Sequence, residues 1–522
     1  MIVEASAESD VIIAGGGANA LVCALVLVRA GLTVKMVEDL PAVGGVHRSE
    51  YPFARAPRLA TFTGVHRIGF VPPNLEAHLG LRLPLAARDP AFFIPSIEPG
   101  RHVLGRDGLR DAEGLDARDT EALAALHAEL DAFVSDLQPS WTLPPMPVED
   151  VAERFVRAER RDAFVRLCRG SFAEYAARFG IQSSLLKGAL AADALGGSFA
   201  SWDAPGSGAP LLVRHAARSR TGGGDAVAVG GLGALARTLA EAAQAGGAEL
   251  ITGSVGQIVV DGNNATGVIL ADGTLLRAGA VVTSSDPWRL RALVGAERLP
   301  VEYMRRIDGF ARKGGITKLN VAFSALPRFA CLPEDRGQHR ATTFLLPQVD
   351  TIRALGRAFA DATAGRLPLE TSIECIFPSA GDAGLRDADG RHSASLLVPW
   401  TPYDLAGTTW SAEEESFTSA LLDTLESFAP GARALVTDTV LWHPKKLESH
   451  FGVMRGHLGH IDETMLFGDR LAPTTPIRGL YACGEGCAPA GGIFGVAGLA
   501  AARQVVSDFE LALERTEVGV YG

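Results

Sequence analysis

The sequence predicts an α/β protein that has a discontinuous domain built on a parallel sheet and an inserted α+β domain with a helical lid. Two glycine-dense segments, at residues 15–17 and 484–498, each follow a short apolar strand and precede a helix of small residues. They stand near opposite ends of a 522-residue chain, which is too long for one core. The two segments therefore indicate one domain whose parts come from both ends of the chain.

The first glycine segment lies inside a strand–helix–strand unit. Residues 11–14 are uniformly apolar, as in a buried parallel strand, and residues 19–30 form an apolar helical pattern. Gly31 marks the end of that helix, and residues 33–37 read as the second strand. This order of elements is that of a Rossmann-like βαβ unit.

The turn itself has the pattern G-x-G-x-x-A. Gly15 permits the tight turn, Gly17 lets a pyrophosphate approach the backbone, and Ala20 allows the helix to pack closely on the strand. The amides of Ala18 and Asn19 open the helix, where free N–H groups and the helix dipole favour phosphate. The turn therefore predicts a dinucleotide-binding site.

An acidic residue stands where a ribose-binding carboxylate is expected. Glu38 ends the second strand, 23 residues after Gly15, and there it can accept hydrogen bonds from ribose hydroxyls. A carboxylate in this place disfavours a 2′-phosphate, and so disfavours NADP.

A second pair of glycines, Gly44 and Gly45, follows Glu38 in "EDLPAVGGVHRSE". The E-x5-G-G pattern after a βαβ fingerprint resembles the glutathione-reductase-type FAD fold, and "GGVHRSEYPF" resembles the branch of phytoene desaturase-like oxidoreductases. The resemblance implies that residues 46–49 line the diphosphate and ribityl part of FAD, with Arg48 as a contact. The alternative for Arg48 is a solvated arginine in a loop. No C-x4-C pair follows, unlike the disulfide-reductase branch.

The same resemblance implies how the chain divides into domains. In that family the adenine is contacted by the backbone of a strand in the second part of the FAD-binding domain, here at Val255. The segment around residues 115–200 has apolar positions at helical spacing and is expected to be mainly helical. We expect an FAD-binding domain of residues 1–75, 215–295 and 470–522, and a substrate domain of residues 76–214 and 296–469.

Three residues are candidates for catalysis by resemblance. Lys318, in the alternating strand 315–323, corresponds to the flavin-facing lysine of the related amine oxidases; the alternative is a strand lysine that faces solvent or pairs with a carboxylate. His457 and His460, in "RGHLGH", fall where the family has polar groups near the reacting carbon, and a structural role is the alternative. No H-E-x-x-H motif accompanies the histidines of residues 443–460, so no metal is expected.

The second glycine segment resembles the C-terminal FAD motif of the phytoene desaturase-like enzymes. Residues 480–483 read as a strand ended by Gly484, and a helix is expected from near Gly492. The resemblance places Glu485 at the ribityl chain. It directs the backbone of Gly492, Ile493 and Phe494 at the flavin pyrimidine ring. A helix N-terminus aimed there would stabilise the charge of reduced flavin.

The resemblance implies an FAD-dependent oxidoreductase that moves a hydride from a substrate C–H bond to flavin N5. The product would carry a C=C bond or an oxidised carbon in a largely apolar small molecule, and oxygen or a quinone would take the electrons. One alternative is a flavin amine oxidase, because the pair Gly484–Glu485 is common there. A non-enzymatic binding protein of the Rab-escort type is the other, and the intact second glycine segment argues against it.

Composition restricts the partners. The formal charge is −11 and no run of Lys or Arg stands out, which argues against nucleic acid. The six cysteines form no C-x-x-C pair and read as reduced thiols. The first residues lack the pattern of a signal peptide, so a cytoplasmic protein is expected, with peripheral membrane contact left open.

Overall fold

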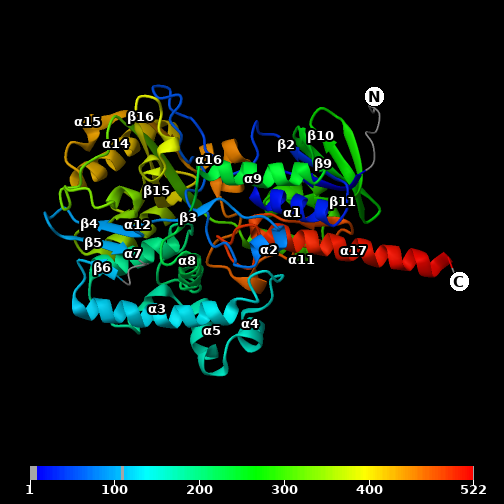
Figure 1. Cartoon of the computed structure of the whole chain (residues 1–522), viewed down its shortest axis with the longest axis horizontal. Coiled ribbons are helices and arrows are strands. Elements are labelled where there is room, and N and C mark those ends of the chain that lie inside the picture. Colours follow the sequence, from blue (N-terminus) through cyan, green and yellow to red (C-terminus); the bar gives the residue numbers. More distant parts are fainter. Residues whose placement is uncertain (1–8, 107–110, 521–522) are drawn as a thin grey trace.

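The computed structural model describes residues 9–106 and 111–520, and for residues 111 and 511–520 the backbone alone. The expectation about a signal peptide rests partly on residues 1–8, which lie outside this range. Two large sheets stand side by side, with a set of helices below the second one, as Figure 1 shows. No helix in the described range is long and apolar enough to cross a bilayer.

The first sheet joins strands from three distant parts of the sequence. Its order is β8-β2-β1-β11-β10-β9, and β17 pairs with β11. The pairs β1–β2, β1–β11, β2–β8 and β11–β17 are parallel, whereas β9, β10 and the first part of β11 form an antiparallel extension. The strands are β1 (Ser9–Ala14), β2 (Val34–Glu38), β8 (Glu249–Thr252), β9 (Val255–Asp261), β10 (Asn264–Leu270), β11 (Leu275–Thr283) and β17 (Leu480–Ala482).

Three helices pack on this sheet: α1 (Ala18–Arg29), α9 (Leu232–Ala245) and α17 (Val496–Val520). α1 lies between α9 and α17 in Figure 1. The α1–α17 contact is close, since a Cβ at Gly498 would lie 1.9 Å from the Asn19 carbonyl oxygen. The small residues of both helices therefore serve backbone-to-backbone packing.

The expectation that the last helix starts near Gly492 is wrong. α17 begins at Val496. Gly492 and Gly495 have φ of 77° and 76°, which a right-handed helix does not admit, and residues 492–494 instead pair with Phe70. Glycine density at this point supports an extended turn before the helix.

The second sheet has the order β16-β12-β15-β14-β13-β4-β5-β6. β12 was expected to alternate between buried and exposed residues, yet every residue in it is buried. The strand lies inside the sheet between β16 and β15, and both of its faces are covered. The strands are β4 (Phe92–Pro95), β5 (His102–Arg106), β6 (Asp111–Glu113), β12 (Gly314–Phe323), β13 (Thr342–Leu345), β14 (Ile373–Ile376), β15 (His392–Pro402) and β16 (Val436–Trp442). A small sheet pairs β3 (Leu85–Ala87) with β7 (Ala226–Ala228).

The segment around residues 115–200 is mainly helical, in agreement with its apolar spacing. The helices there and just after it are α3 (Ala117–Leu137), α4 (Val148–Phe155), α5 (Arg161–Arg169), α6 (Phe172–Ala177), α7 (Ser184–Leu195) and α8 (Ala209–Ser219). The remaining helices are α2 (Leu75–Leu79), α10 (Pro287–Val294), α11 (Val301–Gly309), α12 (Thr351–Thr363), α13 (Pro378–Gly381), α14 (Trp410–Phe428), α15 (Ala432–Leu435) and α16 (Pro444–Phe451).

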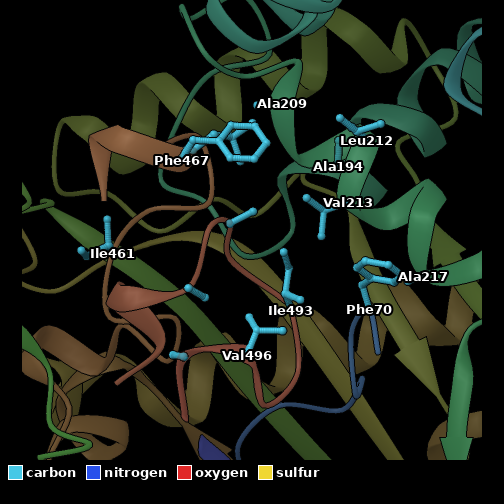
Figure 2. Packing of buried hydrophobic residues seen from close by; sticks show 14 of the residues in the cluster. Phe70, Ala194, Ala209, Leu212, Val213, Ala217, Ile461, Phe467, Ile493 and Val496 are labelled. Carbon is cyan, nitrogen blue, oxygen red and sulfur yellow. The ribbon is translucent and has the colours of Figure 1, made fainter. Parts of the chain in front are cut away.

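A shared hydrophobic core ties α8 to the second glycine segment. Val213 and Ala217 of α8 belong to the same buried cluster as Phe70, Ile493 and Val496. Figure 2 shows these side chains gathered around the turn that precedes α17. Burial of this kind stabilises by about 25 cal/mol per Å² of apolar surface. The helical segment therefore fixes the position of a turn that comes nearly 300 residues later.

Candidate active site

One cavity of about 490 Å³ is lined by both glycine segments, the end of β2 and residues 449–463. Most of the residues predicted from the sequence border it, whereas Ala20, Arg48 and Lys318 do not. Those that line it are Gly15, Gly17, Ala18, Asn19, Glu38, Gly44, Gly45, Val255, His457, His460, Gly484, Glu485, Gly492, Ile493 and Phe494.

The first glycine turn has room for a ligand at one position only. A Cβ at Gly15 would lie 2.3 Å from Ser284 Oγ, and Gly15 has a φ of 101°, so the turn itself requires glycine. A Cβ at Gly17 would meet no atom within 4 Å, although Gly17 lines the cavity. Gly17 therefore leaves open the space that a bound phosphate group needs, as the fingerprint predicts.

Glu38 is buried at the end of β2 and borders the cavity. Its carboxylate accepts hydrogen bonds from Gly16 N at 2.5 Å and from Leu40 N at 2.9 Å. Burial raises the pKa of this carboxyl, while the two amides oppose the shift. The contact of Glu38 with a ribose stays a prediction. The two amides fix the carboxylate at the edge of the cavity, where a ribose could bind to it.

The second glycine turn is held by Glu485. Glu485 Oε1 accepts from Gly492 N at 2.9 Å, and Oε2 accepts from Asn19 Nδ2 at 3.1 Å. Burial raises the pKa of this carboxyl to about 7. Glu485 thus connects the first glycine turn to the second.

Only one of the three backbone amides expected to face flavin is free to do so. Gly492 N donates to Glu485, and Phe494 N donates to Phe70 O at 2.8 Å. Among the described residues, Ile493 N has no hydrogen-bond partner. Ile493 is therefore the amide in this turn that a cofactor can use.

Arg470 supports the same turn, and no motif in the sequence marks this residue. The guanidinium is fully buried and donates to the carbonyl oxygens of Asp462, Met465, Glu485 and Ala488 at 2.8–3.3 Å. Carbonyl groups in irregular backbone need such donors when water is excluded. Arg470 therefore fixes residues 462–465 against residues 485–488.

Arg48 does not reach the cavity. Its guanidinium donates to Glu50 Oε1 at 2.7 Å and lies 5.6 Å from the ring centre of Phe451. The ion pair with Glu50 therefore holds the guanidinium of Arg48 outside the cavity lining. His47, the preceding residue, lines the cavity instead and packs edge-on against Phe494 at 5.6 Å. Burial lowers the pKa of His47 to about 4, so this ring is neutral.

Lys318 does not line the cavity, and His66 lies between it and the cavity. Its ammonium group is fully buried and 3.1 Å from His66 Nδ1, while His66 Nε2 lies 2.6 Å from Glu374 Oε1. A carboxylate only accepts, so Nε2 carries the ring proton and Nδ1 accepts from Lys318. Burial lowers the pKa of Lys318 to about 7 and that of His66 to about 4. His66 and Glu374 border the cavity, whereas Lys318 does not.

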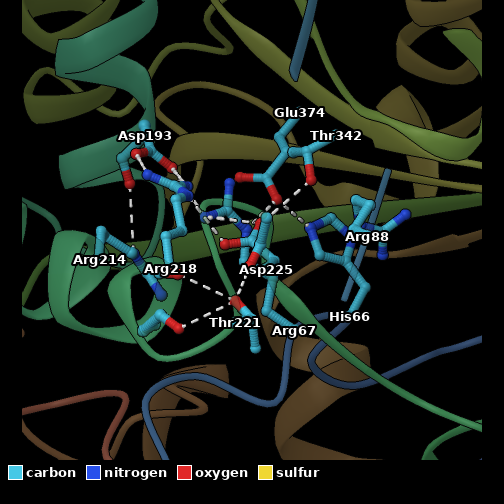
Figure 3. A network of polar contacts seen from close by, with 12 residues as sticks. His66, Arg67, Arg88, Asp193, Arg214, Arg218, Thr221, Asp225, Thr342 and Glu374 are labelled. Atoms are coloured by element: carbon cyan, nitrogen blue, oxygen red, sulfur yellow. Dashed lines mark hydrogen bonds and ion pairs between the residues drawn. The ribbon is translucent and has the colours of Figure 1, made fainter. Parts of the chain in front are cut away.

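His66 also belongs to a buried network of charges (Figure 3). Arg67 donates to Glu374 at 2.5 Å and to Asp193 at 2.7 Å. Arg218 of α8 binds Asp193 through two nitrogens at 2.5 and 2.6 Å. The network joins the helical segment to β14, and its paired charges offset the cost of their burial.

His457 and His460 lie in a segment of strained backbone. Five non-glycine residues in the described range have left-handed φ, and three of them are Arg455 (54°), His460 (61°) and Phe467 (49°). Such conformations cost about 1–3 kcal/mol each and persist where surrounding contacts impose them. Neither ring nitrogen of His457 has a hydrogen-bond partner among the described residues, and Asp462 Oδ2 lies 4.0 Å from Nε2.

One wall of the cavity is apolar. Ile316, Leu397, Val453 and Leu458 belong to one buried cluster with Leu447, and these four line the cavity. Val46 and Val65 pack on this cluster and also line the cavity. His457 belongs to the same lining.

Comparison with known proteins decides the family. A family model described as flavin containing amine oxidoreductase matches residues 21–506. The chain belongs to this family. A mouse relative, pyridine nucleotide-disulfide oxidoreductase domain-containing protein 2, is 29% identical over 96% of this chain and 94% of its own length. A lycopene-forming phytoene desaturase of Paracoccus is 26% identical over 51% of this chain and 52% of its own, which confirms the resemblance found in the sequence.

The solved structures support the fold of this flavoprotein. Putrescine oxidase in complex with putrescine aligns over 97% of this chain and 99% of its own, with a TM-score of 0.60 and 15% identity. Family and fold together identify FAD as the cofactor. The residues fit it: Gly17 leaves space for phosphate, Ile493 offers a free amide, and Glu38 stands at the end of β2.

Several lining residues escaped the sequence analysis: His66, Arg67, Arg214, Glu374 and Glu463. They come from loops, helices and strands of the middle of the chain, where no motif marks them. The six cysteines are free and buried. The described residues contain no group of three His, Cys, Asp or Glu that could hold a metal ion.

Proposed function

We propose that this flavoprotein removes a hydride from a C–H bond of a largely apolar small molecule and gives a C=C bond or an oxidised carbon. Bound FAD supplies the hydride acceptor, and oxygen or a quinone takes the electrons. The observation that carries the proposal is the apolar wall of Ile316, Leu397, Val453 and Leu458, in the cavity that also contains Ile493 and His457.

An amine substrate is the competing proposal, since the family is described by amine oxidation. An unpaired carboxylate in the cavity is the group that would bind an ammonium ion most directly. Glu374 is already paired with His66 and Arg67, and Glu463 with Arg214 at 2.9 Å. Glu374 and Glu463 are therefore committed to protein cations. The Asp286 carboxylate, which also lines the cavity, accepts from the backbone amides of Arg289 and Met454. These pairings favour an uncharged substrate.

We propose that His457 accepts the proton that the substrate loses in the reaction. Its ring nitrogens have no hydrogen-bond partner in the described range, and the carboxylate of Asp462 at 4.0 Å would pair with the ring once it is protonated. Asp462 is itself fixed by Phe199 N at 2.9 Å and Thr464 Oγ1 at 2.8 Å. Arg312 Nε also binds Asp462 Oδ2, at 3.3 Å. His457 would thus accept a proton next to a rigid carboxylate whose charge Arg312 partly offsets.

We further propose that the helical segment around residues 115–200, with α8, acts as the lid of an inserted substrate domain. Gly196 and Gly197, which follow α7, line the cavity, and α8 contributes the Arg214–Glu463 pair and a core shared by Val213 and Ile493. A lid excludes water, which strengthens the electrostatic interactions inside.

Anaerobic titration of the purified holoprotein tests this function. Apolar alkenes and alicyclic compounds, and in parallel primary and secondary amines, are added while the flavin absorbance is followed. Bleaching by an uncharged compound and by no amine supports C–H oxidation. Bleaching by amines alone replaces the proposal with amine oxidation, and a colourless protein without flavin refutes both.

A further inference from the structure

Arg214 is a cavity residue that no motif marks. It lies in α8, its side chain is 14% exposed, and it lines the cavity beside Gly492. A Cβ at Gly492 would lie 3.6 Å from Arg214 Nη1. The guanidinium therefore stands directly against the turn that is expected to face flavin.

Two contacts set the direction of this guanidinium. Arg214 Nη2 donates to Glu463 Oε2 at 2.9 Å. Nε donates to the Asp193 carbonyl oxygen at 3.3 Å, and Figure 3 shows this second contact. Among the described residues, Nη1 has no hydrogen-bond partner, and it is not among the side-chain atoms sealed from solvent. Nη1 is thus a charged donor that is held in place and open to the cavity.

The other charged groups at this turn are already engaged. Arg470 donates to backbone carbonyl groups, and Glu485 accepts from Gly492 N and Asn19 Nδ2. Glu463 accepts from Arg214 and packs against Gly197 and Gly491, where any Cβ would touch it. Among the charged groups described at this turn, Arg214 has a donor left for a ligand, in addition to the free amide of Ile493.

We propose that Arg214 donates Nη1 to the pyrimidine edge of FAD and stabilises the negative charge that this edge carries in the reduced cofactor. A charge-assisted hydrogen bond in a cavity closed from water is well suited to this role. Glu463 tunes the effect, because its negative charge partly offsets that of the guanidinium. The assignment rests on the proposed function, since it requires FAD in this cavity with its pyrimidine ring at Gly492.

Inorganic sulfite tests the assignment without an organic substrate. Sulfite adds through its sulfur lone pair to flavin N5 and leaves negative charge on the N1 and C2-carbonyl side, so its affinity reports stabilisation of that charge. The dissociation constant for sulfite and the flavin reduction potential are measured on the wild-type holoprotein and on Arg214→Met, Arg214→Lys and Glu463→Gln. Flavin content and thermal unfolding are recorded for each variant.

For Arg214→Met we expect sulfite to bind at least about tenfold more weakly and the potential to fall, because a charged donor is lost. Arg214→Lys keeps the charge and should recover part of the loss. Glu463→Gln keeps the acceptor but removes the opposing charge, so sulfite should bind more tightly. A purely structural role would weaken flavin retention in both Arg214 variants and would give no gain in Glu463→Gln.

Unchanged sulfite affinity in an FAD-replete Arg214→Met protein would overturn the assignment. If Arg214→Met does not retain FAD, the Glu463→Gln protein decides, and weaker or equal sulfite binding there counts against the assignment. These measurements use no substrate. Their failure is therefore distinct from failure of the proposed C–H oxidation, which the substrate titration detects.

Discussion

Asn19 and Glu485 stand 466 residues apart in the sequence, and Asn19 Nδ2 donates to Glu485 Oε2 at 3.1 Å. The other end of the Asn19 amide, Oδ1, accepts from Gly498 N at 3.4 Å. One side chain at the start of α1 therefore binds both the second glycine turn and the start of α17. The two parts of the cofactor site are aligned by direct contact and not only by the sheet below them.

The space at Gly17 predicts a selective effect on cofactor binding. In Gly17→Ala the added methyl group enters the cavity without touching protein, and its φ of −66° is ordinary for alanine. We expect the dissociation constant of FAD to rise about tenfold or more, since overpacking by a methyl group costs about 1–3 kcal/mol. The stability of the apoprotein should not fall. Titration of apoprotein with FAD, followed by flavin fluorescence, measures the effect.

Gly309→Ala is the matched control. Gly309 also has open space around its Cβ position and an ordinary φ, but it lies at the end of α11, away from the cavity. FAD affinity should be unchanged there. Equal effects of the two substitutions would show that the open space at Gly17 does not hold the cofactor.

Glu485 predicts a pH dependence of apoprotein stability. Its folded pKa of about 7 lies above the ordinary 4.5, so the folded state favours the protonated form. The stability that Glu485 contributes is complete below pH 4.5 and is lost as the pH rises to 7. Glu485→Gln should remove this part of the pH dependence. The free energy of unfolding of the variant should therefore rise relative to that of wild type between pH 4.5 and 7. Urea unfolding of both apoproteins at pH 5, 6, 7 and 8 measures the difference.

Lys318 predicts a slope at higher pH and of opposite sign. Burial lowers its pKa from 10.5 to about 7, so the folded state releases the proton that the unfolded state keeps. The charged form of Lys318 lowers the free energy of unfolding below pH 7, and this loss is recovered as the pH rises from 7 towards 10.5. In urea unfolding, Lys318→Met should not show this rise in stability between pH 7 and 10.5. A variant with the same slope as wild type would mean that Lys318 stays charged beside His66.

Arg470 predicts the largest loss of stability. In Arg470→Met four buried carbonyl groups lose their donor, and the cost is about 3–5 kcal/mol in the free energy of unfolding. Arg503→Met, which removes an exposed arginine that donates to one carbonyl of Thr142, should cost about 1 kcal/mol at most. Similar losses in the two variants would contradict the supporting role of Arg470.

The sequence predicts well those parts of the site that are local in the chain. The turn at Gly15 and Gly17, the acid at Glu38 and the strand before Gly484 each depend on neighbours within about one helical turn or one strand, and the structure has them where they were expected. The start of α17 was misplaced, because glycine at 492 and 495 signals both a small-residue helix and a positive φ. Sequence alone does not separate these two meanings.

The polar groups around the substrate region could not be predicted, since they depend on contacts between distant elements. His66 meets Glu374 from 308 residues away, and Arg214 meets Glu463 from 249. Lys318 was expected to face flavin, with a lysine that faces solvent or pairs with a carboxylate as the alternative. Because β12 is buried along its whole length, Lys318 contacts His66 instead. Burial of this kind follows from tertiary packing, which no spacing within one strand reveals.

The parallel pairing of β17 with β11 has a consequence for how the protein is made. Gly17 leaves the ribosome long before Gly484, and at 5–20 residues per second the interval is roughly 25–90 s. Throughout it, the first glycine turn lacks Glu485, β17 and the start of α17. Cofactor capture is therefore an event of the finished polypeptide, and translation that stops before residue 484 yields a chain that cannot hold flavin at its second turn.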